Sequence, residues 1–561
     1  MERIDSYSEA LYHVKRGFLI VGLTGFTGSG CSTVRSILES EKKPKTPGYN
    51  VISTFQSSQS QRNHTHKEIR KNAKSDRDRR IYEKLARTWQ GLLWEPFVPV
   101  KVSTVIFTSA IACALNGKVK GNDLKGIQPT IRAKESKLKA ISGLWAADKP
   151  DDDMSWELVD AYETADALYD QFKGGFHCRL GEFTKLMQDF GDQIRSYGTV
   201  EPGSAARADP ANLFVLPEAL RRIIKAYRNA KQASHFVVDA FRNPFEIEFF
   251  KWRYSEFYLL AVLRNKKDRW EDLDLLKDEK ERLEARESKT RNRTKENITE
   301  WIISQDIEEC LTKADIYVEN PRDETGEYPY LKFNLLKLIS LAKSPGCIPP
   351  TKDERSMQMA MTARQMSGCI SRRVGAVVVN QEGYLAGFGW NDPPRGQPPC
   401  SLRTAKELLE NPSQPIFSKF EMRKEFRELV RRTCDVNQPF CFRHEFITLT
   451  NKTDGEREHT RALHAEENAL FQALKGAGDN LEGATLYTTD QPCTLCAKKA
   501  YHLGIDRIVY IQDYPDIAVA QTLEAGTRRV EVQRFQGVTG SAYFKLFSSL
   551  MPEKDIIQLY D

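Results

Sequence analysis

Two short stretches in the last third of the chain carry residue types that hold a catalytic metal. His464 and Glu466 are separated by one residue, and Cys493 and Cys496 are separated by two. One imidazole and two thiolates are ligands that zinc accepts, and a metal held by three protein ligands keeps a fourth position open for water. Zinc lowers the pKa of a bound water to about 7, so such a centre supplies hydroxide at neutral pH.

Glu466 completes this pattern because it lies close to the ligands without being one of them. His-x-Glu followed by Pro-Cys-x-x-Cys is the signature of zinc-dependent nucleobase deaminases, in which the glutamate moves protons. We expect Glu466 to take a proton from water, pass it to a ring nitrogen and then help the amine to leave. The alternative is a structural zinc site or unrelated buried cysteines. A structural site would need a fourth ligand nearby, and it would leave Glu466 without a role.

The surrounding elements predict how these residues are positioned. The apolar spacing after His464 predicts a helix, and a second helix is predicted after Cys496, ending at Gly504. Thiolates at the start of a helix are stabilised by its dipole and by unpaired N–H groups. Strands are predicted at 374–379, 385–390, 485–488 and 507–512. The alternation of strands and helices predicts an α/β fold with three α/β/α layers for this part of the chain.

Between residues 395 and 460 the chain shows no clear periodicity and is predicted to be a long irregular insertion. This insertion contains Cys400, Cys434, Cys441 and His444. Their spacing could hold a second, structural zinc, and the alternative is that they are ordinary free thiols and a surface histidine.

A glycine-rich turn near the N-terminus has the context of a phosphate-binding loop. Residues 17–21 predict a buried strand, the turn follows it, and a helix begins at about Val34. The Walker A spacing assigns nucleotide-binding positions to Gly25, Gly28, Gly30, Cys31, Ser32 and Thr33. We therefore predict a bound nucleotide, ATP or another, with Mg²⁺ at Ser32. The alternative is a glycine-rich turn with no ligand.

Cys31 changes what this loop can do, because a lysine normally stands at its position. That lysine contacts the β- and γ-phosphates and offsets charge during phosphoryl transfer. Backbone N–H groups and the helix dipole still favour a phosphate without it. The loop is therefore predicted to bind a nucleotide, with phosphoryl transfer in doubt.

The rest of the N-terminal half predicts a parallel sheet. Buried strands are predicted at 235–239, 257–263 and 314–319. Asp239, at the end of the first of these, could meet the nucleotide or cap the following helix. The basic run 62–80 is predicted to be a solvated helix face, with contact to phosphates or RNA as the alternative. The highly charged run 264–300 is predicted to be a solvated helix, with a mobile lid as the alternative.

Residues 344–350 contain three prolines and a glycine, which interrupt helices and strands, and they predict the domain boundary. We therefore predict a nucleotide-binding domain over residues 1–345 and a zinc deaminase domain over residues 351–561.

Composition fits a protein of the cytoplasm. The chain has 561 residues, of which 40% are hydrophobic and 29% charged, and its net charge of +6 is small for this length. Eleven cysteines are too few for a disulfide framework, and no signal peptide or membrane span is predicted.

Several motifs together resemble the deoxycytidylate deaminase family over residues 355–550. They comprise residues 371–379, 387–391, 464–470 and 492–498. The resemblance implies that His464, Cys493 and Cys496 bind zinc, that Glu466 shuttles protons and that Asn391 hydrogen-bonds the nucleoside.

The N-terminal motifs extend the resemblance. The glycine-rich loop and residues 238–243 look like a deoxynucleoside monophosphate kinase domain, and the combined order resembles the bacterial antiphage deoxycytidylate deaminases. Members of that family convert dCTP and dCMP to dUTP and dUMP, which deprives phage replication of deoxycytidine nucleotides. They are held inactive by a small RNA until infection. Free deoxycytidine nucleotides, an inhibitory RNA and assembly into a homo-oligomer are thus the expected partners.

Three other functions fit parts of the pattern. Deamination of cytosine or adenine within DNA or RNA would need a positive, aromatic channel for a single strand. A bifunctional kinase-deaminase would need phosphoryl transfer despite Cys31. A nucleotide sensor without catalysis would leave the complete set of zinc-chemistry residues unexplained.

Overall fold

The computed structural model describes most of the chain, in two compact units. The described residues are 17–45, 69–117, 128–145, 156–175, 180–201, 207–273, 275–287, 298–323, 325–451, 460–477, 481–514 and 517–558. Among these, residues 350–540 form the C-terminal unit, and residues 17–349 with 541–558 form the N-terminal unit.

The N-terminal unit is built on parallel strands. In the order β5-β4-β1-β3-β2, neighbouring strands of this unit pair in parallel. Their bounds are β1 (Leu19–Thr24), β2 (Val98–Lys101), β3 (His235–Asp239), β4 (Phe257–Leu263) and β5 (Ile316–Glu319). Every residue of β1 and β4 is buried, as expected for central strands covered on both faces. The parallel sheet predicted from the sequence is therefore present.

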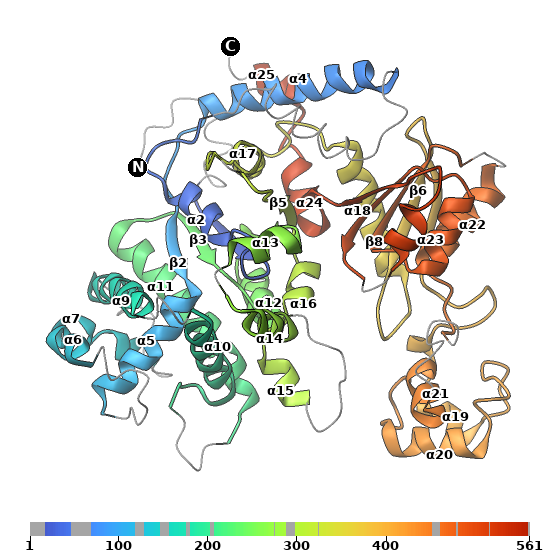
Figure 1. Cartoon of the computed structure of the whole chain (residues 1–561), viewed down its shortest axis with the longest axis horizontal. Coiled ribbons are helices and arrows are strands. Elements are labelled where there is room, and N and C mark those ends of the chain that lie inside the picture. Colours follow the sequence, from blue (N-terminus) through green and yellow to red (C-terminus); the bar gives the residue numbers. More distant parts are fainter. Residues whose placement is uncertain are drawn as a thin grey trace. The chain divides into compact units, whose positions relative to one another are not determined.

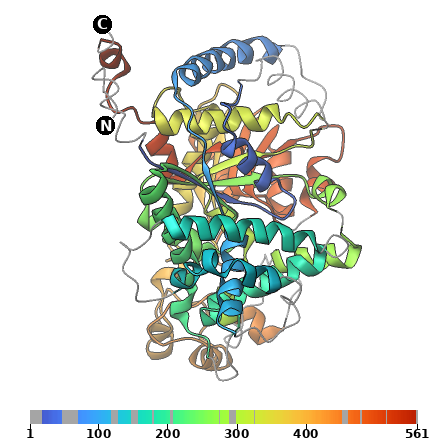
Figure 2. The same ribbon diagram turned by 90° about the vertical axis from the view of Figure 1, so that its left-hand side faces the viewer.

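Four long helices of this unit pack against one another. They are α5 (Val102–Leu115), α9 (Trp156–Gly174), α10 (Leu180–Tyr197) and α11 (Val215–Lys231), and Figure 2 shows them gathered together. The α5 sequence is apolar on all sides, and eleven of its residues are buried. A helix that is hydrophobic all round belongs inside a core, which agrees with the burial of α5.

The charged run 264–300 differs from its prediction as one long solvated helix. It contains α13 (Lys266–Asp272), α14 (Lys277–Glu287) and, from residue 298, α15 (Ile298–Ile303). The prediction of one continuous helix was wrong, because residues 275 and 276 are not helical. Most residues of α13 and α14 are exposed or half-buried, as predicted, whereas Glu287 is only 1% exposed. Of the basic run 62–80, residues 69–80 lie in α4 (Ile69–Gly91), and residues 62–68 lie outside the described chain.

The C-terminal unit has a five-stranded mixed sheet in the order β10-β9-β8-β6-β7. The strands are β6 (Gly375–Val379), β7 (Leu385–Trp390), β8 (Thr485–Asp490), β9 (Arg507–Gln512) and β10 (Glu531–Arg534). Strand β6 is antiparallel to β7 and β8, whereas β8, β9 and β10 are parallel. Figure 1 shows α18 (Lys352–Met366) on one face, and α22 (Ala465–Ala477) and α23 (Thr494–His502) on the other. The predicted mixed α/β architecture is confirmed.

Two glycines allow α22 to lie directly on the sheet. A Cβ at Gly387 would lie 2.1 Å from the carbonyl oxygen of Ala469, and a Cβ at Gly389 would lie 2.3 Å from the Ala469 nitrogen. The obstacles are backbone atoms of a helix, which cannot turn aside as a side chain can. The alternating glycines of β7 therefore set how closely α22 packs on the sheet.

The insertion 395–460 is not irregular, as the sequence had suggested. It contains α19 (Ala405–Glu410), α20 (Lys424–Thr433) and α21 (Phe442–Thr450) around a small core of its own. That core includes Ala405, Leu408, Phe417, Phe426, Val430 and Phe440. The prediction missed these helices because each has ten residues or fewer, which is less than three turns of apolar periodicity.

In the part of the chain that the structure describes, no helix combines the length and apolar character needed to cross a membrane.

Replacing Gly389 by alanine is expected to destabilise the C-terminal unit. The added methyl group would push α22 away from β7, and overpacking of this kind costs about 1–3 kcal/mol of unfolding free energy. Urea unfolding followed by tryptophan fluorescence measures this cost. Gly91→Ala is the matched control, because nothing lies within 4 Å of the Cβ added there. Equal stability of the two variants would contradict the packing argument.

Candidate metal centre

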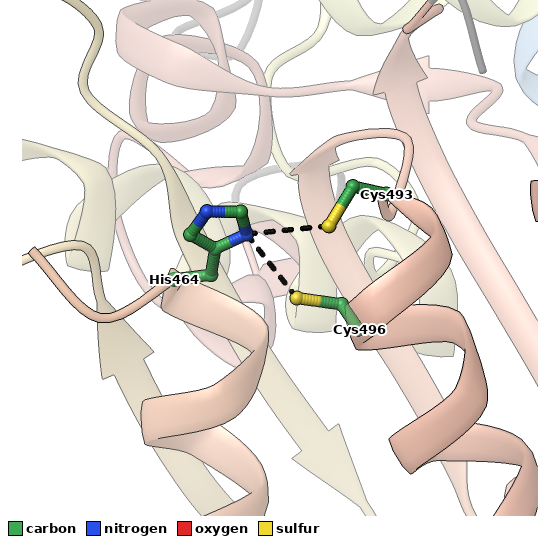
Figure 3. A group of neighbouring side chains, drawn as sticks. All are labelled: His464, Cys493 and Cys496. Atoms are coloured by element: carbon green, nitrogen blue, oxygen red, sulfur yellow. Dashed lines mark hydrogen bonds between the residues drawn. The ribbon is translucent and has the colours of Figure 1, made fainter. Parts of the chain in front are cut away.

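Three side chains from two helix starts converge in the C-terminal unit (Figure 3). His464 directly precedes α22, Cys493 is the N-cap of α23, and Cys496 lies in the first turn of that helix. The His464 Nδ1 lies 3.5 Å from the Cys493 Sγ and 3.3 Å from the Cys496 Sγ. All three ligand atoms lie within 4.8 Å of one another, so the prediction from spacing places them together correctly.

This donor set fits zinc. Zn–N bonds of 2.0–2.1 Å and Zn–S bonds of 2.3 Å at a tetrahedral angle give an N···S separation of about 3.6 Å, close to the distances seen here. Both cysteines are buried, whereas His464 is half-buried. Among the described residues this is the one cluster of three such groups at metal-binding separation.

Neighbouring groups lower the pKa of one of the two thiols, which favours binding of a cation. A hydrogen bond with Cys496, assisted by His464, lowers the pKa of Cys493 to about 4. Cys493 is therefore a thiolate at neutral pH, as a zinc ligand must be. Its position at the start of α23 adds the favourable end of the helix dipole.

Glu466 is the second residue of α22 and is 4% exposed. Burial raises the pKa of Glu466 to about 7, with smaller contributions from Cys493 and Asp490. A carboxyl group with such a pKa can both accept and release a proton near neutrality, which is what a proton shuttle requires. Arg372, which pairs with Asp490, brings a positive charge to the same neighbourhood.

Glu467 has a different role from its neighbour, and the sequence reasoning missed it. Its carboxylate accepts a hydrogen bond from the His464 N–H at 2.9 Å and pairs with Lys499 on α23. Glu467 therefore ties the start of α22, which carries His464, to the helix that carries the cysteines. The spacing of a residue at a helix start and a glutamate three residues later is a capping pattern that could have revealed this contact.

Asn391 lies at the end of β7, 9% exposed, with its side-chain amide engaged by the backbone. Its Oδ1 accepts from the Val374 N–H at 2.7 Å, and its Nδ2 donates to the Arg372 carbonyl at 2.8 Å. These bonds hold the segment that leads into β6. The contact with a nucleoside stays a prediction.

The cysteines of the insertion are not brought together as a set of four ligands. Cys434 donates to the Glu445 carboxylate at 3.6 Å. Burial raises the pKa of Cys441, and the charges of Cys400 and Cys369 act in the same direction. Cys369 lies outside the insertion and was not among the predicted ligands. His444 is not part of any metal-binding cluster in the described residues.

In the N-terminal unit the glycine-rich loop joins β1 to α2 (Cys31–Glu39). The loop residues Gly25, Gly28 and Gly30 precede the first helical turn, which contains Cys31, Ser32 and Thr33. Gly28 has φ 83° and Gly30 has φ 102°, a backbone region that favours glycine. Burial raises the pKa of Cys31 to about 12, so its thiol is neutral and does not replace the charge of a lysine.

Asp239 does not cap the helix that follows it. The cap of α12 (Pro244–Arg253) is Asn243, whose Oδ1 accepts from the Phe245 N–H at 3.0 Å. Asp239 pairs instead with Arg35 of α2 at 2.8 Å. The capping alternative was therefore wrong, because asparagine stands closer to the helix start.

Comparison with known proteins places the similarity in the C-terminal unit. The cytidine and deoxycytidylate deaminase zinc-binding region matches residues 350–512, which include His464, Glu466, Cys493 and Cys496. The chain is 31% identical over 160 residues to the deoxycytidylate deaminase of Enterobacteria phage T2, covering 28% of this chain and 78% of that protein. It is 30% identical over 184 residues to the deoxycytidylate deaminase of Schizosaccharomyces pombe, covering 32% of this chain and 44% of that protein. A solved dCMP deaminase from the cyanophage S-TIM5 is 23% identical with a TM-score of 0.20, covering 34% of this chain and 100% of that one.

Removing the Lys499 charge is expected to weaken metal binding. In Lys499→Met the Glu467 carboxylate loses its partner on α23, and loss of a contact that orients a ligand costs about 10–100-fold in metal affinity. Competition with a chromogenic zinc chelator measures the affinity. Lys498→Met, an exposed position on the same helix, is the matched control. Equal zinc affinity of the two variants would show that the pair between the helices does not position His464.

Proposed function

The chain belongs to the deoxycytidylate deaminase family, and from this membership we propose that its C-terminal unit deaminates free deoxycytidine nucleotides, dCMP and dCTP. The observation that carries the proposal is the buried Glu466 beside three convergent zinc ligands. The reaction adds water to the cytosine ring and releases ammonia, which leaves dUMP or dUTP.

The residues of this centre divide the work between binding and proton transfer. His464, Cys493 and Cys496 would hold zinc, which when bound supplies a nucleophile from water near neutral pH. Glu466 takes the proton that water gives up and delivers it to N3 of the cytosine ring. Glu466 then moves the proton of the hydroxyl group added at C4 to the exocyclic nitrogen, so that the C4=O bond forms as the C4–N bond breaks and ammonia leaves.

The N-terminal unit is proposed to bind a nucleotide that supports or regulates the deaminase. The strand, glycine-rich turn and helix in the order β1, loop and α2 support this role. The neutral Cys31 disfavours phosphoryl transfer.

The resemblance noted in the sequence supports a role in antiphage defence by depletion of deoxycytidine nucleotides. In that role the protein would act in the cytoplasm as a homo-oligomer, with ATP or another nucleotide and Mg²⁺ at the loop and a small RNA as inhibitor.

Glu466→Ala is expected to lower deamination by at least about 100-fold, since a positioned acid–base group contributes roughly 10²–10⁴-fold. Ammonia release from dCMP and dCTP, with and without ATP, measures the effect. Zinc content of the same preparation is the internal control, and it should stay near that of the unaltered protein because Glu466 is not a ligand. Turnover at an unchanged rate would show that another group moves the protons.

The same assay separates this function from its alternative. CTP and single-stranded DNA are included as substrates beside dCMP and dCTP. Turnover of the free deoxynucleotides alone is the expected result. Faster turnover of single-stranded DNA would instead place the protein among the enzymes that modify nucleic acids.

A further inference from the structure

A buried carboxylate occupies the glycine-rich loop of the N-terminal unit. Glu287 is the last residue of α14, and its side chain is 2% exposed. The two carboxylate oxygens accept from the Thr27 N–H at 3.1 and 3.2 Å, and one accepts from the Thr27 hydroxyl at 2.5 Å. The same oxygen accepts from Arg242 at 2.5 Å. A loop that is built to bind anions thus already holds one, supplied by its own chain.

The surroundings of the loop favour negative charge. Arg242 donates to the Thr27 hydroxyl oxygen at 3.1 Å, and Arg269 donates to the Thr27 carbonyl at 3.1 Å. Arg264 donates to the Gly28 carbonyl at 3.4 Å. Arg264 is already paired with Asp272, so Arg242, Arg269 and the start of α2 are the groups that make this a place where an anion is stable.

The position of Glu287 along the loop indicates which part of a ligand it would replace. Cys31 stands where a phosphate-binding lysine would reach the β- and γ-phosphates. Glu287 and Arg242 both contact Thr27, a residue of the same loop four positions before Cys31. Glu287 and Arg242 therefore lie beside the outer phosphates of a nucleotide bound in the usual way.

We propose that Glu287 is a built-in anion that stands in the place of a nucleotide's terminal phosphate, so that a nucleoside triphosphate binds only in exchange for this carboxylate. The proposal rests on the proposed nucleotide binding by the loop. A carboxylate and a phosphate repel each other and compete for the same N–H group and guanidinium. Binding of a triphosphate therefore withdraws Glu287 and leaves Arg242 paired with the phosphate.

Replacement of the Glu287 carboxylate by a nucleotide at the loop also affects α14, the helix that carries Glu287. Arg286, next to Glu287, binds Asp189 at 2.8 Å and Asp192 at 2.6 Å, both on α10. The end of α14 is thus clamped between the loop and α10. A ligand that expels Glu287 has to loosen this end, which gives the unit two states, one closed by the carboxylate and one occupied by the nucleotide.

The alternative is that Glu287 and Arg242 form a purely structural ion pair. Breaking a buried pair is destabilising because one charge is left without its partner. A structural pair would therefore affect stability, but it would not affect ATP and ADP differently. The difference between these two ligands separates the two interpretations.

Isothermal titration of the full chain with MgATP and MgADP tests the proposal. Glu287→Gln is expected to bind MgATP at least about tenfold more tightly than the unaltered chain, the effect of about one charge-assisted hydrogen bond. The gain for MgADP, which lacks the terminal phosphate, should be much smaller. Glu281→Gln, on the same helix with a side chain 62% exposed, is the matched control and should change neither affinity.

The outcomes separate the inference from the function on which it rests. Equal MgATP affinity of the unaltered chain and Glu287→Gln would overturn the exchange and leave nucleotide binding intact. Equal gains for MgATP and MgADP would overturn the assignment to the terminal phosphate. Absence of binding of either nucleotide to both proteins would overturn the proposed nucleotide site together with the inference.

A second measurement uses the unaltered chain, so its result does not depend on whether the Glu287→Gln variant folds. Hydrogen exchange of residues 277–287 is expected to rise when MgATP saturates the protein, because α14 loses its contact with Thr27. Slower or unchanged exchange of this helix in the saturated protein would overturn the proposal.

Discussion

The metal centre depends on the close packing of α22 against β7. His464 precedes α22, so the seating of that helix decides whether its imidazole reaches the two thiols at the start of α23. Gly387 and Gly389 permit this seating because any side chain there would meet the backbone of α22. The sheet then acts as a rigid base on which two helix starts face each other. The placement of the His464 ligand thus depends on a backbone-to-backbone contact at Gly387 and Gly389.

Two adjacent glutamates are placed for different roles, because one is buried and the other forms an ion pair. Glu466 is buried, with a pKa near 7, so it can exchange protons. Glu467, one position on, points to the His464 N–H and to Lys499, where it braces the two helices. The helix turns by about 100° per residue, so neighbours in the sequence face different surroundings. Glu466 is thus placed to exchange protons, whereas Glu467 contacts the backbone of the ligand residue His464 and pairs with Lys499.

The sequence predicted the metal centre well because the information is local. His464, Cys493 and Cys496 lie beside sequence patterns that predict helix starts. The strands, such as 385–390, can be predicted because their apolar residues alternate with others or follow one another without interruption. The helices of the insertion were missed because they are short. The contacts of Glu287 were missed because they join Thr27 and Arg242, which are distant along the chain, and no pattern of apolar residues encodes such an ion pair.

Cys31 and Glu287 are best understood together. A lysine at position 31 would have brought a positive charge to the loop and would have attracted the Glu287 carboxylate or a phosphate alike. With a neutral thiol there, Arg242 is the charge that Glu287 contacts directly, and a carboxylate that carries one negative charge balances it. The neutral thiol at position 31 thus agrees with the proposal that the loop exchanges an internal anion for an external one.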